Sequence, residues 1–263
     1  MFPIFDMQSQ TNKGLRALLV ATSALGGLLL LWPLFASAQS IQSWQSVGAP
    51  LLTVLLIPAM IALAVSEVIG NSFNTRQLAI LAVVTAVAAA VRPLGAGVAG
   101  IEPIWIIVIV AGCAMGTTSG FVVGSSAIAT SALFTGSIGP WLPYQMLTAA
   151  WIGAGAGFIG ASKKFQVALL SAYSALATFL FGWLMNLWFW PTATGLVADI
   201  AFDPTQSPAE RVSAWIHFSL ISSVGFDIPR SLFTTVGVAL AAPALLKTIN
   251  RANRRALVTP SKP

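Results

Sequence analysis

Six polar side chains stand out in this sequence because they lie inside or directly beside long apolar segments. They are Arg92, Glu102, Gln145, Asn186, Asp227 and Arg230. Guanidinium, carboxylate and amide groups recognise ligands by charge and by hydrogen bonds. The sequence has no Walker-type phosphate loop, no zinc motif on a helix and no Gly-x-Ser-x-Gly turn. We therefore expect a binding protein or a conduit and not an enzyme, with no catalytic residue, no cofactor and no metal.

The stretch Gly139-Pro140-Trp141-Leu142-Pro143-Tyr144-Gln145-Met146 joins two of the apolar segments. A loop so rich in proline, glycine and aromatic residues has a defined shape. Its glutamine needs a polar partner at the edge of an apolar region. We expect Trp141 and Gln145 to line a ligand site, together with Trp190 from a later segment.

The composition predicts an integral membrane protein. The chain has 263 residues, of which 57% are hydrophobic and 8% are charged, whereas a soluble domain is about one quarter charged. Strand-like alternation is absent, so the spans should be helices. The single cysteine, Cys113, excludes an intrachain disulfide. The basic charge is explained by membrane orientation, without a nucleic-acid partner.

Eight apolar segments predict an all-α membrane protein of about eight spans. They are 17–37, 49–68, 77–91, 103–116, 118–135, 141–159, 165–190 and 226–247. Segments 77–91 and 103–116 are shorter than the ~20 residues that cross a bilayer comfortably. Helices that stop early leave a cavity near one face.

The positive charges predict the orientation. With a cytoplasmic N-terminus, ten Lys and Arg residues lie inside and three lie outside. The inner ones are Lys13, Arg16, Arg76, Lys163, Lys164, Lys247, Arg251, Arg254, Arg255 and Lys262, and the outer ones are Arg92, Arg211 and Arg230. This bias places both termini in the cytoplasm. The first segment, which ends in Ala36-Ser37-Ala38, also resembles a cleaved secretory signal, although its length favours a retained anchor.

In this topology the six polar groups lie at the outer ends of their helices, and this coincidence indicates a site. Each group also has a structural interpretation. Asp227 is a candidate N-cap for the last span, with Pro229 in its first turn and Arg230 one turn away as an ion-pair partner.

The other four polar groups also have possible partners within the chain. Arg92 could pair with Glu102 across the loop that separates them. Gln145 and Asn186 could bond to each other between helices. We expect no polar residues that continue from this level toward the inner face.

Small residues mark two further helix faces. Ala82, Ala86 and Ala90 recur every four residues, which allows another helix to approach closely. This face could pack inside the protein or receive a partner subunit. The glycines of 153–160 predict equally close packing of the segment that contains them.

The connection 192–225 is the longest and should form an outer cap. Ser207, Pro208 and Glu210 predict a helix start, with Ser207 as N-cap and Glu210 reaching back to it. The only histidine, His217, has no metal-ligating residue at helical spacing. We divide the chain into two extra helices in 1–76, a six-helix core in 77–250 with the cap, and a basic tail in 251–263.

The motifs resemble the S component of energy-coupling factor (ECF) transporters. The matching residues are Arg92-Pro93-Leu94-Gly95, Glu102-Pro103, Gly139 to Met146, Asn186 to Pro191, and Gly225-Phe226-Asp227-Ile228-Pro229-Arg230. The nearest branch is the larger actinobacterial type with predicted cobalamin specificity. The resemblance covers 77–255 and extends to the two preceding spans.

The resemblance implies a multi-pass subunit in a bacterial plasma membrane that captures a vitamin, with cobalamin the best candidate. Its pocket would use Arg92, Gln145, Asn186 and Asp227. Ala82, Ala86 and Ala90 would dock a transmembrane scaffold subunit, which acts with two cytosolic ATPases. The cap at 192–225 departs from small members of the family and fits a larger ligand.

Two functions of other classes stay open. A standalone secondary transporter or channel would move a small molecule without ATP, but we see no inverted repeat of broken helices. A membrane scaffold without a ligand would tolerate alanine at Arg92, Gln145 and Asp227.

Overall fold

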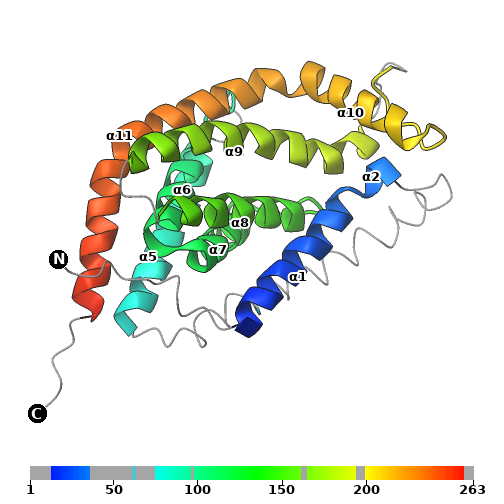
Figure 1. Ribbon diagram of the computed structural model, residues 1–263. Coiled ribbons are helices and arrows are strands. Elements are labelled where there is room, and N and C mark those ends of the chain that lie inside the picture. Colours follow the sequence, from blue (N-terminus) through cyan, green and yellow to red (C-terminus); the bar gives the residue numbers. More distant parts are fainter. Residues whose placement is uncertain are drawn as a thin grey trace, which may run out of the picture.

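The computed structural model describes residues 13–35, 62, 75–95, 98–160, 165–193 and 199–257, and these ranges contain helices and no strand (Figure 1). The α-helices are α1 (Lys13–Leu30), α2 (Trp32–Phe35), α5 (Thr75–Val91), α6 (Ile104–Met115), α7 (Thr117–Thr135), α8 (Leu142–Ile159), α9 (Gln166–Phe189), α10 (Pro208–Ser222) and α11 (Val224–Leu257). Two 3₁₀ helices, η2 (Arg92–Gly95) and η3 (Trp190–Thr192), follow α5 and α9.

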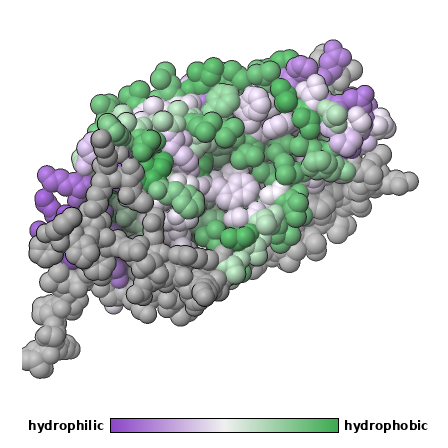
Figure 2. All heavy atoms as spheres, viewed as in Figure 1, coloured by the Kyte–Doolittle hydropathy of each residue, from purple (hydrophilic) through white to green (hydrophobic). Residues whose placement is uncertain are grey.

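Four of the described helical segments are long and apolar enough to cross a membrane: Thr75–Gly95, Thr117–Thr135, Gln166–Thr192 and Val224–Arg255. The predicted all-α membrane fold is confirmed at this level. Figure 2 shows a mostly hydrophobic face, with hydrophilic residues at the end that holds α10 and at the opposite end. Eight spans and cytoplasmic termini stay predictions, and the segment 49–68 lies outside the described residues apart from position 62.

Most predicted boundaries agree with the helices to within two residues. The first segment differs, because α1 ends at Leu30 and α2 begins at Trp32. Pro33 disfavours a continuous helix here, since proline lacks a backbone N–H and restricts the residue before it. The last helix is longer than predicted: α11 continues to Leu257, and the basic residues of its final turn, Arg254 and Arg255, favour a helix C-terminus.

Helices α7 and α8 pack with their backbones in contact. A Cβ atom on Gly120 would collide with the carbonyl oxygen of Gly153, and a Cβ on Gly153 would collide with that of Gly120. One turn further along each helix, a Cβ on Gly124 or on Gly157 would meet the backbone of the other helix. The predicted close packing of the 153–160 glycines is therefore confirmed, and it forms the centre of the apolar core.

Helix α11 packs along α9 and then turns away from it (Figure 1). Pro243 lies inside α11, and an internal proline bends a helix because it removes one backbone hydrogen bond. The N-terminal part of α11 thus lies beside α9, where Asp227 and Arg230 are located.

Helix α10 joins the N-terminal helices to the rest of the structure. Ser207 and Glu210 form the predicted capping box: the Glu210 carboxylate accepts from the Ser207 backbone N–H at 2.8 Å. These hydrogen bonds, first that from the Ser207 hydroxyl, lower the pKa of Glu210. Arg211 is buried and donates to the carbonyl of Pro33 at 3.0 Å. Arg211, predicted only as one of the outer positive charges, therefore fixes α10 to α2.

Candidate functional site

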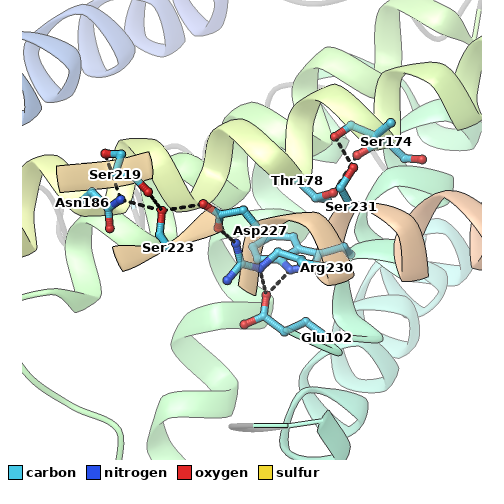
Figure 3. A network of polar contacts seen from close by, with 11 residues as sticks. Glu102, Ser174, Thr178, Asn186, Ser219, Ser223, Asp227, Arg230 and Ser231 are labelled. Carbon is cyan, nitrogen blue, oxygen red and sulfur yellow. Dashed lines mark hydrogen bonds and ion pairs between the residues drawn. The ribbon is translucent and has the colours of Figure 1, made fainter. Parts of the chain in front are cut away.

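A connected polar network joins the start of α11, the end of α9 and the loop before α6 (Figure 3). Arg230 Nε lies 2.9 Å from Glu102 Oε2, and Arg230 Nη1 lies 2.5 Å from Asp227 Oδ1. Ser223 donates to the other Asp227 oxygen at 2.6 Å. Asn186 donates to Ser223 at 2.9 Å. Four of the six predicted polar residues thus belong to one network.

The loop before α6 places Glu102 against α11. Gly100 has a φ of +75°, and a Cβ there would collide with the carbonyl oxygen of Phe226. Only glycine fits this close approach without strain. The Trp105 indole also donates to Glu102 and fixes the carboxylate from the first turn of α6.

Gly182 makes room for the ion pair on α9. A Cβ atom on Gly182 would collide with the Asp227 carboxylate and would lie 2.8 Å from Arg230 Nη1. The guanidinium also lies over the ring of Phe181, 5.3 Å from its centroid. Asp227 and Arg230 therefore pack directly on the α9 backbone, between an apolar ring and their own hydrogen-bond partners.

The network runs from a buried end to an exposed end. The side chains of Asp227, Arg230 and Glu102 are 1%, 11% and 30% exposed. A buried charge is costly without a partner, and both buried charges have one. Glu102 is the charged group of this network that a ligand could reach without displacing a helix.

A second, smaller network lies at the junction of α5, α7 and α8. Arg92 donates to Gln145 at 3.0 Å and lies 3.5 Å from the Ser131 hydroxyl. Both Arg92 and Gln145 are half-buried. Arg92 also interacts electrostatically with Glu102. All six predicted polar residues therefore lie in one of two networks.

The structure decides between several predicted pairings. The Asp227–Arg230 ion pair is confirmed. Asp227 is not the N-cap of the last span, because α11 already begins at Val224 and Asp227 lies within its first turn. Glu102 forms its ion pair with Arg230, 128 positions away, and not with Arg92.

The two amides do not bond to each other. Gln145 accepts its hydrogen bond from Arg92, whereas Asn186 donates to Ser219 at 3.0 Å as well as to Ser223. Gln145 therefore belongs to the smaller network and Asn186 to the larger one.

The predicted aromatic residues occupy two different environments. Trp141 is half-buried and stacks edge to face on Trp188, with ring centroids 5.9 Å apart. Trp190 is fully buried, and its indole N–H donates to the carbonyl of Ile200 at 2.8 Å. Trp141 thus lies at an accessible edge, whereas Trp190 is buried and fixes the backbone at Ile200.

The alanine stripe lies on the outside of the structure. Ala82, Ala86 and Ala90 are exposed on α5, whereas Leu81 and Ala89 face the core. Within the described ranges this stripe is not used for internal packing, which leaves it accessible to another helix.

Hydroxyl residues between α9 and α11 are absent from the sequence prediction. Ser174 and Thr178 are fully buried at this interface, and Ser231 donates to the carbonyl of Ala175 at 2.8 Å (Figure 3). These buried hydroxyls continue the polar contacts between α9 and α11 beyond the network, where no further polar residues were expected, and which end of these helices faces inward stays a prediction. The sequence does contain a pattern that indicates this polar face. Small and polar residues recur every four positions, which is the spacing of one helix face, at Ser174, Thr178, Gly182 and Asn186.

A largely apolar pocket of about 190 Å³ lies between α8 and α9. It includes Trp151, Tyr173 and Phe181, and its rim includes the exposed Leu176 and Leu180. Phe181 is the ring beneath Arg230, so the pocket and the larger polar network share one side chain.

The described residues contain no group of three His, Cys, Asp or Glu side chains that could hold a metal ion. Comparisons with known protein families, with curated proteins and with solved structures find no match to this chain.

Proposed function

We propose that this protein is the substrate-binding S component of an ECF-type importer in a bacterial plasma membrane. It captures a vitamin, with cobalamin the leading candidate, at the outer face. A transmembrane scaffold subunit and two cytosolic ATPases complete the importer, and this chain carries out no chemical step.

The observation that carries the proposal is the pair of networks around Glu102 and Arg92. They gather charged and amide groups from the ends of five helices, and each network keeps an accessible member at its edge. Apolar side chains would hold these helices together at lower cost than buried ions. Recognition of a ligand with both donors and acceptors explains why such groups are present together.

The residues divide into two roles by burial. Arg92, Glu102, Trp141 and Gln145 are accessible and contact the ligand directly. Buried Asp227, Arg230, Asn186 and Trp190 hold the wall of the site in place. This division follows the general pattern in which partners behind a site fix the orientation of the contacting groups.

The exposed alanine stripe supports the role of a subunit. Small residues let two helix backbones approach in the membrane, and Ala82, Ala86 and Ala90 are exposed on α5. They would dock the scaffold subunit and transmit its movement to the ligand-loaded protein.

Equilibrium binding to the purified protein in lipid nanodiscs tests the proposal. A panel of vitamins that includes cobalamin should contain a member that binds tightly, with no ATP present. Binding of no member contradicts the proposal. A second assay measures uptake of the bound vitamin into liposomes that contain this protein. Uptake should require the scaffold subunit and the two ATPases.

The standalone transporter is the second candidate, and the buried hydroxyls between α9 and α11 are the feature that bears on it. The hydroxyl stripe of Ser174, Thr178 and Ser231 extends the polar surface between α9 and α11 away from the networks. Each of the three hydroxyls donates to a backbone carbonyl, which fits helix packing better than a conduit. ATP-independent uptake into liposomes by this protein alone would support the transporter.

A further inference from the structure

Three buried aromatic donors have no hydrogen-bond partner among the described residues. They are the hydroxyl of Tyr144 on α8 and the indole N–H groups of Trp183 on α9 and Trp215 on α10. Other aromatic donors in the same structure are satisfied: Trp190 donates to the Ile200 carbonyl, and Tyr173 donates to the Ile152 carbonyl at 2.7 Å. The three unpaired donors are therefore exceptions that require an explanation.

Two of the donors adjoin one apolar cluster, and the third contacts one of these two. Tyr144 belongs to this cluster and is 1% exposed. Trp215 packs against it from α10. Trp183 stacks edge to face on Trp215, with ring centroids 5.7 Å apart and planes at 84°. The donors thus come from α8, α9 and α10, and they are linked through Trp215.

Unpaired donors are costly in such surroundings. A buried N–H or O–H that loses water and gains no acceptor destabilises the folded state, and the penalty grows where water is excluded. A protein that keeps three of them in one cluster has another use for them. The simplest use is to donate to a bound molecule.

We infer that Tyr144, Trp183 and Trp215 form a subsite that receives hydrogen-bond acceptors of the transported molecule. The inference rests on the proposed function and names the ligand chemistry. Tryptophan can only donate, so the ligand must present hydrogen-bond acceptors, such as carbonyl or carboxylate oxygens. The surrounding aromatic rings favour an apolar or conjugated body that bears these oxygens on its edge.

Helix α10 covers this subsite and must move to admit a ligand. The Trp183–Trp215 pair closes the space between α9 and α10. Asn186 bonds to Ser219 of α10 at 3.0 Å, and Arg211 of α10 bonds to the Pro33 carbonyl. A ligand that takes up the unpaired donors would compensate for separating the two tryptophan rings.

The two tyrosines of the chain provide a matched test. Tyr144→Phe removes an unpaired hydroxyl, and Tyr173→Phe removes a paired one. Both variants and the wild type are placed in nanodiscs. Equilibrium binding is measured for the vitamin that the wild type binds, and cobalamin is tested first. The thermal midpoint of each ligand-free protein is measured in parallel.

The two variants should change different quantities, one the ligand affinity and the other the thermal midpoint. Tyr144→Phe should weaken ligand binding about fivefold to tenfold without lowering the thermal midpoint of the free protein. Tyr173→Phe should lower the midpoint and leave binding unchanged. Trp183→Phe and Trp215→Phe should each weaken binding to a similar extent.

The inference is overturned if Tyr144→Phe and both tryptophan variants bind like the wild type. It is also overturned if Tyr144→Phe lowers the thermal midpoint as much as Tyr173→Phe does, because its hydroxyl would then have a structural partner. In both cases the proposed function stands if the wild type binds a vitamin. If the wild type binds none, the proposed function fails and the subsite fails with it.

Discussion

The guanidinium of Arg230 lies 2.9 Å from the carboxylate of Glu102, although 128 positions separate the two residues in the chain. This contact fixes the N-terminal part of α11 to the loop before α6. It also leaves the Glu102 side chain 30% exposed beside a buried ion pair. The site therefore has a rigid wall and one accessible acidic group.

Removal of the buried acid should destabilise the protein. Asp227→Ala leaves Arg230 without its closest partner, and breaking a buried pair costs about 3 kcal/mol. The free energy of unfolding in detergent should fall by this amount. Asp203→Ala is the control, because Asp203 lies in the connection before α10 and its carboxylate accepts hydrogen bonds from the nearby Thr205. An Asp227→Ala protein as stable as the control would contradict the structural role of the pair.

A methyl group on Gly182 should disturb the same pair. Gly182→Ala places a Cβ against the Asp227 carboxylate, so the ion pair must shift away from α9. We expect a loss of stability of about 1–3 kcal/mol, typical of overpacking. Gly225→Ala is the matched control, because nothing lies within 4 Å of the Cβ that it adds. Equal midpoints for the two variants in thermal unfolding would exclude the close contact.

Bulky residues on the alanine stripe should separate ligand binding from uptake. Ala86→Trp and Ala90→Trp add volume to an exposed face, so ligand binding to the isolated protein should be unchanged while uptake with the partner subunits is lost. Leu240→Trp, on the exposed face of α11, should leave both unchanged. Uptake assays and binding assays on the same variants provide the comparison. Loss of binding in the Ala86 variant would mean that the stripe packs internally.

The cap on α10 should weaken in acid. Hydrogen bonds from Ser207 lower the pKa of Glu210 in the folded protein. The cap therefore contributes its full stability above the ordinary glutamate pKa of about 4.3. It loses this contribution as the pH falls through the lower, folded value. Hydrogen exchange over 207–222 should accelerate in that acidic window.

Glu210→Gln is the control for this pH dependence. Its amide does not titrate in that window, so the acid-induced acceleration over 207–222 should be much smaller than in the wild type. The same acceleration in both proteins would assign the effect to other carboxylates, such as Asp203, whose pKa is lowered by hydrogen bonds from Thr205.

The helices were predictable because their signals are local. Apolar runs bounded by glycine and proline place α5 to α9 correctly, and Ser207 and Glu210 predict the start of α10. The C-terminal extension of α11 was not predicted, because apolar character ends before the helix does. A charged amphipathic turn can continue a helix into water.

The partners of the site residues were less predictable. Asp227 and Arg230 are three positions apart on one helix, so their pairing followed from spacing. Glu102 pairs with Arg230 and not with Arg92 because α11 approaches the loop closely at Gly100. This approach is a tertiary property that the local sequence does not contain. The buried position of Arg211 likewise depends on α2, a helix 178 positions earlier in the chain.

The most direct test of the proposed function compares two arginines at opposite ends of the same helical segment. Arg92 bonds to Gln145 at the proposed site, whereas Arg76 lies exposed at the other end of α5. The measurement is the cobalamin dissociation constant of the wild type, Arg92→Ala and Arg76→Ala in nanodiscs, with the other vitamins as competitors. We expect tight binding by the wild type and Arg76→Ala, and affinity at least about tenfold weaker for Arg92→Ala. Wild-type protein that binds no vitamin, or an Arg92→Ala variant that binds as tightly as Arg76→Ala, would contradict the account.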